Sequence, residues 1–570
     1  MSDFLFSTRR RPPGELRRHL DDYLAPVSAG FEEHHGAWGS LAVARAHHDA
    51  VVVESDAALL TVLAGDPVVR GGAEAPALAA FGPRRHAVHE LLRPPGGVPW
   101  DGHLDGHFAA LAVDPATGRG RVVTDLFAFV PVYAATAVSG ELVLGTHVDA
   151  VARAGGRGAD LDPVSAADFV ASYVVTFPHT LYAGVEQLPP GTERAFSRGG
   201  WDDGGRVYWQ PLEETGFGSL PAAAAALRQA VADDVRAASA GGGPVGLLLS
   251  GGEDSRAILG AMPPETEVRA FVYADWESRE VRIARRVARA HGAGLTVGWR
   301  GASHYIDGLE TAAALLGSQH LFSDVHGLGF HETLGIRDLP VVLGGLSSDS
   351  LLKAEYGVPL PQVPALPGVR PELLREVAAR RAAFRDRLAE IRPRTADEWA
   401  VLYPFSMRRH GGNLHGNRRL FRSHEVYHAT GVLRVAAGVP QEWKRRRRLF
   451  HRAMRPFLAR TWQVPHAKAR YPYFGHHANL LLAPGLAAAR GLRAVLRGET
   501  RARQAPWPKW RSIADSPAAA RRRRELPLLE TPLAALFVPA SPGAVESSVA
   551  HWYALHRLAL LQLAFLSTRP

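Results

Sequence analysis

Apolar and polar positions follow two different patterns along this chain, and the change of pattern divides it. In residues 1–209, short and partly alternating apolar runs are separated by glycine- and proline-rich turns, which is typical of strands joined by hairpins. From residue 220 onward, mainly apolar runs at 245–249 and 268–273 alternate with stretches of helical periodicity. The pattern predicts stacked sheets in residues 1–209 and, in residues 210–570, an α/β fold with a doubly wound parallel sheet and a helical C-terminal part.

Helical stretches flank the first of these buried strands. Residues 222–239 are alanine-rich, and residues 277–292 carry apolar side chains at helical spacing and end in Gly292, as helices commonly do. Strand, helix, strand and helix in succession indicate a parallel sheet, and such sheets bind ligands beyond the carboxyl ends of their strands. The turn after residues 245–249 is therefore the first position to examine for a site.

That turn reads Ser-Gly-Gly-Glu-Asp, and a helix is expected from Ser255. A strand that ends at two glycines before a helix leaves backbone N–H groups pointing at one spot, where a phosphate fits. Ser250 and Ser255 add hydroxyl donors, and a carboxylate beside a phosphate, here Asp254, is explained by Mg²⁺ between them. The turn predicts binding of a polyphosphate, most simply ATP; the alternative is an ordinary strand-to-helix turn. Glu253 has no role in this interpretation.

A second small-residue turn follows the apolar run at residues 339–343 and leads to Asp349. If both turns lie at the same edge of the sheet, Asp254 and Asp349 hold Mg²⁺ against the triphosphate from opposite sides. The alternative is that Asp349 caps a helix beginning at Ser350. The histidine-rich stretch at residues 410–440 has no HExxH order and no cysteine nearby, which disfavours zinc.

Composition narrows the class of protein. At 570 residues the chain is long enough for two to four domains, and 46% hydrophobic with 21% charged residues is typical of a soluble globular enzyme. No apolar run reaches the ~18 residues of a membrane span, and the N-terminus has no apolar signal core, so a cytoplasmic protein without a membrane partner is expected. The chain has no cysteine, which excludes disulfides, thiolate metal sites and a cysteine nucleophile. The net charge of +10 is concentrated in arginine runs at 445–448 and 521–524 without interleaved aromatic residues, so no nucleic-acid partner is expected.

Several sequence motifs of this chain resemble those of the asparagine synthetase family. SGGEDS resembles the SGGxDS loop of ATP pyrophosphatases, which convert ATP to AMP and pyrophosphate. Residues 104–135, LDGHFAALAVDPATGRGRVVTDLFAFVPVYAA, resemble the family's glutaminase-type domain, although Thr124 stands where an arginine is usual. Residues 181–196, LYAGVEQLPPGTERAF, resemble the motif that leads into the synthetase domain. The resemblance implies a glutaminase-like (Ntn-type) αββα sandwich in residues 1–209 and an ATP pyrophosphatase domain in residues 210–570.

The resemblance also implies a set of site residues. Lys468, which follows a basic helix and a proline, stands at the position of the family's catalytic lysine; Lys444 is the second candidate, and Glu425 is the acid nearest to a family phrase that is replaced here. The implied metal ligands are Asp254 and Asp349. The implied ATP-binding residues are Leu248, Ser250, Gly251, Gly252, Asp254, Ser255, Val272 and Gly345.

The main departure from the family is at position 2. Glutamine-using members carry a cysteine nucleophile there, whereas this chain has Ser2, so the amine is not expected to come from glutamine. The resulting expectation is an ATP- and Mg²⁺-dependent ligase that adenylates a carboxylate and joins it to another amine. Lasso-peptide cyclisation is the first specific hypothesis, with a precursor peptide and leader-processing proteins as partners. The alternatives are an ammonia-dependent asparagine synthetase, a β-lactam-synthetase-like ring closure of a small molecule, and a non-catalytic ATP-binding scaffold.

Overall fold

Alternate residues of strand β1 (Asp3–Ser7) enter two different cores, and this alternation organises the N-terminal part. Phe4 and Phe6 pack between two sheets, whereas Leu5 packs on the opposite face against helices. The first sheet is antiparallel and has the order β12-β10-β11-β1-β3-β2. Its other strands are β2 (Ser28–Gly36), β3 (Gly39–Ala46), β10 (Tyr133–Thr136), β11 (Leu142–Gly145) and β12 (Val185–Gln187).

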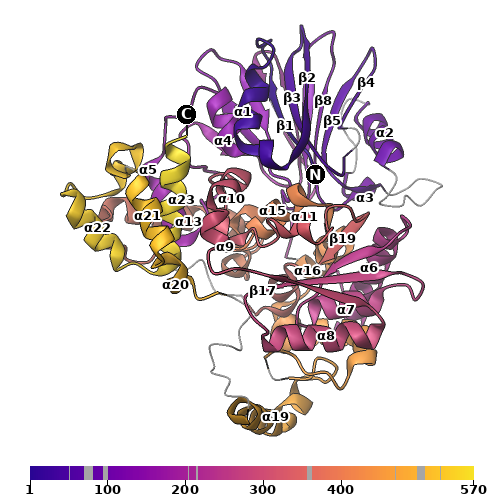
Figure 1. Cartoon of the computed structure of the whole chain (residues 1–570). Helices are drawn as coiled ribbons and strands as arrows, with labels where there is room; N and C mark the ends of the chain where they lie inside the picture. The colour runs from indigo at the N-terminus through magenta and orange to yellow at the C-terminus, as the bar shows by residue number, and fades with distance from the viewer. Residues whose placement is uncertain are drawn as a thin grey trace.

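The second sheet faces the first, and helices cover both outer faces (Figure 1). Helices α1 (Glu15–Leu24) and α4 (Val148–Ala154) lie on the first sheet, and α2 (Phe81–Leu92) lies on the second. These four layers confirm the αββα sandwich. The second sheet contains β4 (Val53–Ser55), β5 (Leu60–Gly65), β8 (Phe108–Val113), β9 (Gly120–Thr124), β13 (Thr192–Ser197), β14 (Gly200–Trp201) and β15 (Arg206–Val207).

The C-terminal part is built on a parallel sheet of five strands in the order β18-β17-β16-β19-β20. The chain runs outward from β16 through β17 to β18 and then returns to the other side of β16 with β19 and β20, which confirms the doubly wound topology. The order reverses between β16 and β19, so a ligand is expected beyond their carboxyl ends. The strands are β16 (Val245–Leu248), β17 (Val268–Ala274), β18 (Gly294–Trp299), β19 (Val341–Gly344) and β20 (Ser423–Glu425).

Helices pack against the face of this sheet that carries Val245 and Leu247. The side chains of Val245 and Leu247 pack with α6 (Leu220–Ser239), α7 (Asp254–Ala261) and α16 (Thr430–Gly438). The predicted helix at 277–292 is α8 (Arg279–His291), which Ser278 caps at its start and Gly292, at φ 74°, ends. Other helices of this part are α9 (His304–Asp307), α10 (Leu309–Leu316), α11 (Phe330–Thr333), α12 (Ser348–Lys353), α13 (Pro371–Ala389), α14 (Ala396–Trp399), α15 (Gly412–Leu420), α17 (Gln441–Lys444), α18 (Arg448–Met454) and α19 (His476–Leu496).

The chain ends in a helical group that packs against both earlier parts. Helix α23 (Ala554–Ser567) contacts α5 (Pro163–Ser172) and α10, and its buried Gln562 donates to the carbonyls of Gly317 and His320 at 2.8 Å each. The other helices of this group are α20 (Trp510–Ala514), α21 (Pro517–Glu525) and α22 (Pro542–Ala550).

The structure is a computed structural model, and it describes residues 1–49, 52–69, 81–93, 100–202, 205–213, 216–355, 363–468, 470–496, 508–526 and 528–569. No helix in these ranges combines the length and the apolar character needed to cross a bilayer. The domain boundary at residues 209/210 lies between β15 and α6 and stays a prediction.

A buried ion group joins the sandwich to the parallel-sheet part. The Asp3 carboxylate accepts from Arg418 at 2.9 Å and from Arg419 at 2.7 and 2.8 Å, and all three side chains are buried. Burial opposes ionisation of Asp3, but the two arginines outweigh it and hold the pKa of Asp3 well below its ordinary value. The first strand of the chain is thereby fixed to α15, more than four hundred residues later.

Replacing Asp3 with alanine leaves two buried guanidinium groups without their carboxylate. We expect Asp3→Ala to lower the free energy of unfolding by about 3–5 kcal/mol, measured by urea denaturation. The matched control is Asp233→Ala, which removes an exposed partner of Arg236 on α6 and should change the same quantity by less than about 1 kcal/mol. Equal effects of the two substitutions would contradict a structural role for the ion group.

Candidate active site

The Ser-Gly-Gly-Glu-Asp turn lies beyond the carboxyl end of β16, at the point where the strand order reverses. The amides of Ser250 and Gly252 donate to the hydroxyls of Ser255 and Ser250, both at 3.1 Å. The amide of Gly251 donates to Glu280 at 3.3 Å. A Cβ at Gly251 would lie 3.1 Å from Glu280, so the turn packs closely on α8. The turn is held in shape by its own serines and leads directly into α7.

The two acidic residues expected at a metal site come together across this turn. Asp254 is the first residue of α7, and Asp349 lies in the first turn of α12. One oxygen of each carboxylate lies 2.5 Å from Nζ of Lys353. Asp349 is therefore inside α12 rather than a cap before Ser350, because the N-cap position belongs to Ser347.

Two residues that follow β19 and β20 in the chain, Gly345 and Tyr427, lie close to Asp254. A Cβ on Gly345 would lie 3.3 Å from Cβ of Asp254, so a side chain at position 345 would press on the first turn of α7. The Tyr427 hydroxyl donates to the backbone carbonyl of Asp254 at 3.0 Å. The predicted ATP-binding residue Gly345 thus lies directly beside the predicted metal ligand.

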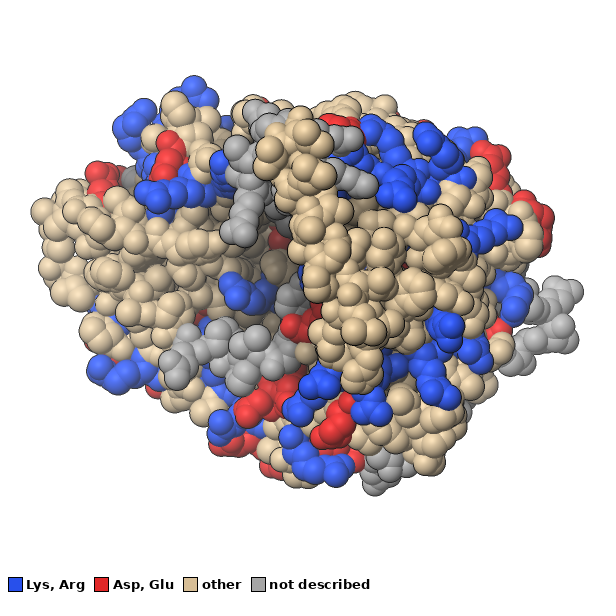
Figure 2. Space-filling model, turned by 90° about the horizontal axis from the view of Figure 1, so that it is seen from below, with Lys and Arg blue, Asp and Glu red and all other residues tan. Residues whose placement is uncertain are grey.

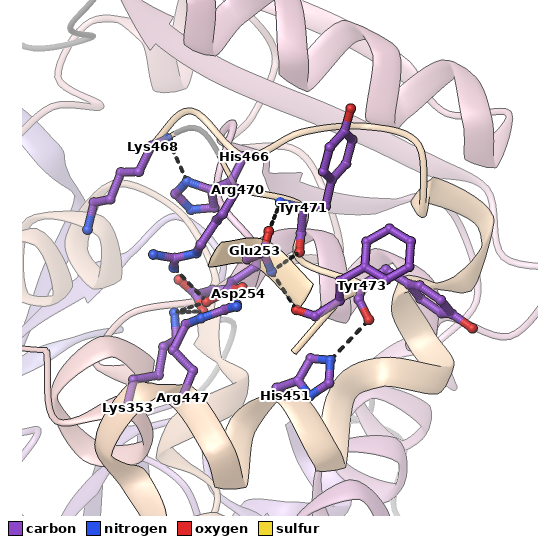
Figure 3. Close-up of polar contacts among 12 residues, drawn as sticks. Glu253, Asp254, Lys353, Arg447, His451, His466, Lys468, Arg470, Tyr471 and Tyr473 are labelled. Atoms are coloured by element: carbon purple, nitrogen blue, oxygen red, sulfur yellow. Dashed lines mark hydrogen bonds and ion pairs between the residues drawn. The ribbon is translucent and has the colours of Figure 1, made fainter. Parts of the chain in front are cut away.

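Sequence reasoning missed Lys353, which ends α12 and projects into the site (Figure 3). Its side chain is 1% exposed and also lies 3.2 Å from Glu253. Burial works against the ammonium, but the carboxylates of Asp254 and Glu253 outweigh it and raise the pKa of Lys353. Burial and the neighbouring carboxylates raise the pKa of Asp254, although Lys353 opposes the change. The spacing of Lys353 four residues after Asp349 was the available signal.

Glu253, which had no role in the sequence interpretation, is fully buried and binds three cations (Figure 3). Besides Lys353, it accepts from Arg447 and, at 2.9 Å, from Arg470. Burial opposes ionisation of Glu253, but Lys353, Arg447 and Arg470 outweigh it and hold its pKa well below the ordinary value. We refer to Glu253, Lys353, Arg447 and Arg470 as the Glu253 cluster.

The segment that carries Lys468 lies over the turn. The buried Arg256 donates to the carbonyls of Val464 at 2.7 Å and Pro465 at 3.2 Å, and the Ala467 amide donates to Gly251 at 3.3 Å. These bonds attach residues 464–467 to α7 and to the glycine turn. Lys468 therefore follows a segment that is fixed to the phosphate-binding candidate.

The Lys468 side chain itself is 56% exposed and stands at the rim. Its Nζ lies 3.1 Å from Glu355, which also lies 3.3 Å from Arg470 of the Glu253 cluster. The predicted catalytic lysine is thus connected to Glu253 of the turn through three successive ion pairs, by way of Glu355 and Arg470.

The second lysine candidate lies elsewhere. Lys444 is buried with its Nζ 5.4 Å from the Trp399 ring centre, and burial, together with nearby Arg392, lowers its pKa to about 7. Within the described ranges, no ion pair or hydrogen bond joins Lys444 to the turn. The structure therefore does not bring Lys444 together with Asp254 and Asp349.

Glu425 lies at the end of β20 and supports the turn before Asp349. Its Oε2 accepts from the Leu346 amide at 2.9 Å, while Oε1 has no hydrogen-bond partner among the described residues. Burial raises the pKa of Glu425 to about 7. Of the remaining predicted residues, Leu248 ends β16, and Val272 lies on the neighbouring strand β17 one residue beyond the partner of Leu248.

The turn before Asp349 also contacts the sandwich. Ser347 has φ 70°, and its hydroxyl shares a 2.7 Å hydrogen bond with His428. His428 in turn shares a 2.9 Å hydrogen bond with His107, which immediately precedes β8, and stacks on Phe129 with ring centres 4.1 Å apart. The N-terminal sandwich thereby supports the turn that presents a predicted metal ligand.

The residues present fit Mg²⁺ bound together with a polyphosphate. Asp254 and Asp349 point carboxylate oxygens at one position, and Mg²⁺ takes one or two carboxylates plus phosphate oxygens and water. Among the described residues, no group of three or more His, Cys, Asp or Glu side chains forms a complete protein site for a metal. The metal would therefore depend on the nucleotide for its remaining ligands.

Two solved structures show distant likeness. One is described as the allosteric regulatory enzyme of purine biosynthesis (10% identity, TM-score 0.26, covering 52% of this chain and 80% of the other). The other is glutamine phosphoribosylpyrophosphate amidotransferase from B. subtilis in complex with ADP and GMP (9% identity, TM-score 0.25, covering 54% and 92%). At these TM-scores the likeness adds nothing to the fold described above. Comparison with curated proteins gives no match.

The comparison with family models is decisive. The model described as asparagine synthase matches residues 224–526, which is more than half of the chain. The matched span includes the Ser-Gly-Gly-Glu-Asp turn, α12 with Asp349 and the segment that carries Lys468. The chain therefore belongs to the asparagine synthase family: an αββα sandwich without a cysteine nucleophile stands in front of an ATP-pyrophosphatase-type domain.

Proposed function

We propose that this protein is an ATP-dependent, AMP-forming ligase that joins a carboxylate to an amine from a source other than glutamine. The observation that carries the proposal is the meeting of Asp254 and Asp349 beside the glycine turn, in a domain of the asparagine synthase type. The Glu253 cluster adds cations on the same side, where negative charge develops as a pyrophosphate leaves.

The chemistry has two steps. An oxygen of the substrate carboxylate attacks the α-phosphorus of ATP, the bond to the bridging oxygen of the β-phosphate breaks, and pyrophosphate leaves. The amine nitrogen then attacks the acyl carbon, the bond from that carbon to the AMP oxygen breaks, and AMP leaves. The amine loses a proton in this second step, so the site needs a proton acceptor.

The residues divide this work. Asp254 and Asp349 would hold Mg²⁺, which when bound supplies positive charge to the phosphate oxygens. Arg447, Arg470 and Lys468 neutralise charge on the leaving pyrophosphate. Glu425 is the proposed proton acceptor, because its Oε1 is unpartnered among the described residues and its pKa of about 7 suits proton transfer.

The amine source follows from position 2. The Ser2 hydroxyl donates to Asp49 at 2.6 Å and accepts from the Ala46 amide at 3.1 Å, so its oxygen is occupied by structural hydrogen bonds. Together with the absence of cysteine, this favours an amine carried by the substrate or by a second molecule. Macrolactam formation on a precursor peptide is the first candidate. Ammonia-dependent asparagine synthesis, β-lactam-like ring closure and a non-catalytic ATP-binding scaffold are the alternatives.

The proposed partners are a peptide or small-molecule carboxylate and leader-processing proteins rather than a nucleic acid. The face seen from below is hollowed near its centre, and acidic as well as basic side chains surround the hollow (Figure 2). Nucleic-acid binding favours a continuous basic surface, because affinity comes mainly from phosphate contacts. The mixed charge of this face suits a substrate that carries groups of both signs.

Asparagine substitutions at the two aspartates test the site. Asp254→Asn and Asp349→Asn each remove one carboxylate charge at nearly constant shape, and we expect each to weaken binding of a non-hydrolysable MgATP analogue by about tenfold or more. ATP–pyrophosphate exchange with a productive carboxylate should fall at least about a hundredfold. Asp233→Asn, on the exposed face of α6, is the matched control and should change neither the affinity for the analogue nor the rate of ATP–pyrophosphate exchange. Wild-type rates of ATP–pyrophosphate exchange in both Asp254→Asn and Asp349→Asn would exclude these two aspartates as the metal ligands.

Product mass distinguishes the candidate reactions. With a peptide that carries a free N-terminus and an internal Asp or Glu, an intramolecular ligase yields a product lighter by one water, together with equal amounts of AMP and pyrophosphate. An asparagine synthetase instead converts aspartate and ammonia, and a scaffold yields no AMP with any substrate. We expect the water loss, measured by mass spectrometry of the peptide.

Glu425→Gln tests the raised pKa. Because the pKa of Glu425 is about 7 in the folded protein, Glu425 stays protonated there at pH values at which it ionises in the unfolded chain. Its contribution to the free energy of unfolding is therefore fully present below the ordinary carboxyl pKa and is lost as the pH rises through 7. The variant keeps an oxygen for the Leu346 amide and cannot ionise. We expect the free energy of unfolding of wild type to fall between pH 5 and pH 8 while that of Glu425→Gln does not. The difference between the two should change by about 1–3 kcal/mol in favour of the variant, measured by urea denaturation. A difference independent of pH would show that Glu425 titrates normally.

A further inference from the structure

Lys353 places an ammonium at the position on which the predicted metal ligands converge. Its Nζ lies 2.5 Å from Asp254, 2.5 Å from Asp349 and 3.2 Å from Glu253, and its side chain is almost wholly buried. Figure 3 shows the side chain rising from α12 to the carboxylates of the glycine turn. The first turns of α7 and α12, which are distant in sequence, thus meet on one cation supplied by the chain itself.

An ammonium and Mg²⁺ compete for such a position, because both take the same carboxylate oxygens. Without a cation, burial and mutual repulsion would separate Asp254 from Asp349 or protonate one of them. Lys353 removes that repulsion while the chain is free of ligands. A metal ion that enters must either displace the ammonium or share the carboxylates with it.

We propose that Lys353 is an internal cation that stands in for the metal ion: it holds Asp254 and Asp349 together until nucleotide and metal arrive, and it blocks metal binding before that. A metal ion without nucleotide would gain only two carboxylate ligands from the protein. The buried ammonium would lose both of these partners, and this loss would outweigh the gain. A metal ion that brings phosphate oxygens also brings new partners for the displaced ammonium. Lys353 is thus a positioning residue that makes metal binding depend on nucleotide.

The structure provides a second set of partners for the ammonium. Glu253 lies 3.2 Å away, and the face of the Phe450 ring lies 4.5 Å from Nζ. A lysine side chain can shift its charge by rotation of its flexible stem, and an aromatic face stabilises a cation. The ammonium can therefore leave the two aspartates without losing all of its neighbours.

The inference goes beyond the proposed ligation and rests on it only in assigning a metal to Asp254 and Asp349. Its test measures metal binding without turnover, so failure of this inference and failure of the ligase proposal are separate results. The probe is Mn²⁺, which takes oxygen ligands as Mg²⁺ does and whose free concentration is read by electron paramagnetic resonance.

The central comparison is wild type against Lys353→Met, both without nucleotide. We expect Lys353→Met to bind one Mn²⁺ about tenfold or more tightly than wild type, because no ammonium competes for the carboxylates. Adding Asp349→Asn to this variant should abolish the gain. Lys509→Met, which removes an exposed lysine of the C-terminal group, is the matched control and should bind Mn²⁺ as wild type does. Equal Mn²⁺ affinity of folded wild type and folded Lys353→Met would overturn the proposal.

Two further measurements remain informative if Lys353→Met is unstable. Wild type should bind Mn²⁺ at this site only when a non-hydrolysable ATP analogue is present, and Asp349→Asn should weaken binding only in that condition. Nucleotide-independent Mn²⁺ binding that Asp349→Asn removes would overturn the proposal. Thermal unfolding of wild type gives the second measurement, since Mn²⁺ should leave its unfolding midpoint unchanged without nucleotide and should raise the midpoint further once the ATP analogue is bound.

Discussion

The buried carboxylate of Glu253 is the interaction on which the candidate site depends. An isolated carboxylate without solvent contact is strongly unfavourable, and it persists here because Lys353, Arg447 and Arg470 surround it. The three cations come from α12, from the segment before α18 and from the segment after Lys468. One side chain inside the glycine turn therefore fixes the turn to three separate parts of the chain.

Local pattern explains why much of the fold could be predicted. Strands β16 and β17 are short apolar runs, α8 carries its cap residue Ser278 and its terminal Gly292, and the glycine turn follows the strand directly. Each of these features depends on neighbours a few residues away. The predicted pair Asp254 and Asp349 needed one further step, because the topology of a parallel sheet brings the ends of adjacent strands together.

The Glu253 cluster could not be predicted in the same way. Glu253 meets Arg447 and Arg470 across 194 and 217 residues, and no periodicity relates an acid to an arginine so far along the chain. Similarly, Lys444 and Lys468 both lie in basic surroundings in the sequence, yet one is buried beside Trp399 and the other stands at the rim of the site. Which lysine faces the turn depends on the bonds from Arg256 to Val464 and Pro465, which only the tertiary structure shows.

Under the proposed function, the charge balance of the site determines how a nucleotide would enter it. Acids and bases are already paired, so a polyphosphate meets no large excess of free positive charge and binds by exchanging partners. Each phosphate oxygen that takes an arginine or lysine releases a carboxylate, and each released carboxylate becomes available to a metal ion. In the proposed mechanism, nucleotide and metal would then favour one another through the same side chains. Those side chains are the acids Glu253, Asp254, Asp349 and Glu355 and the bases Lys353, Arg447, Lys468 and Arg470.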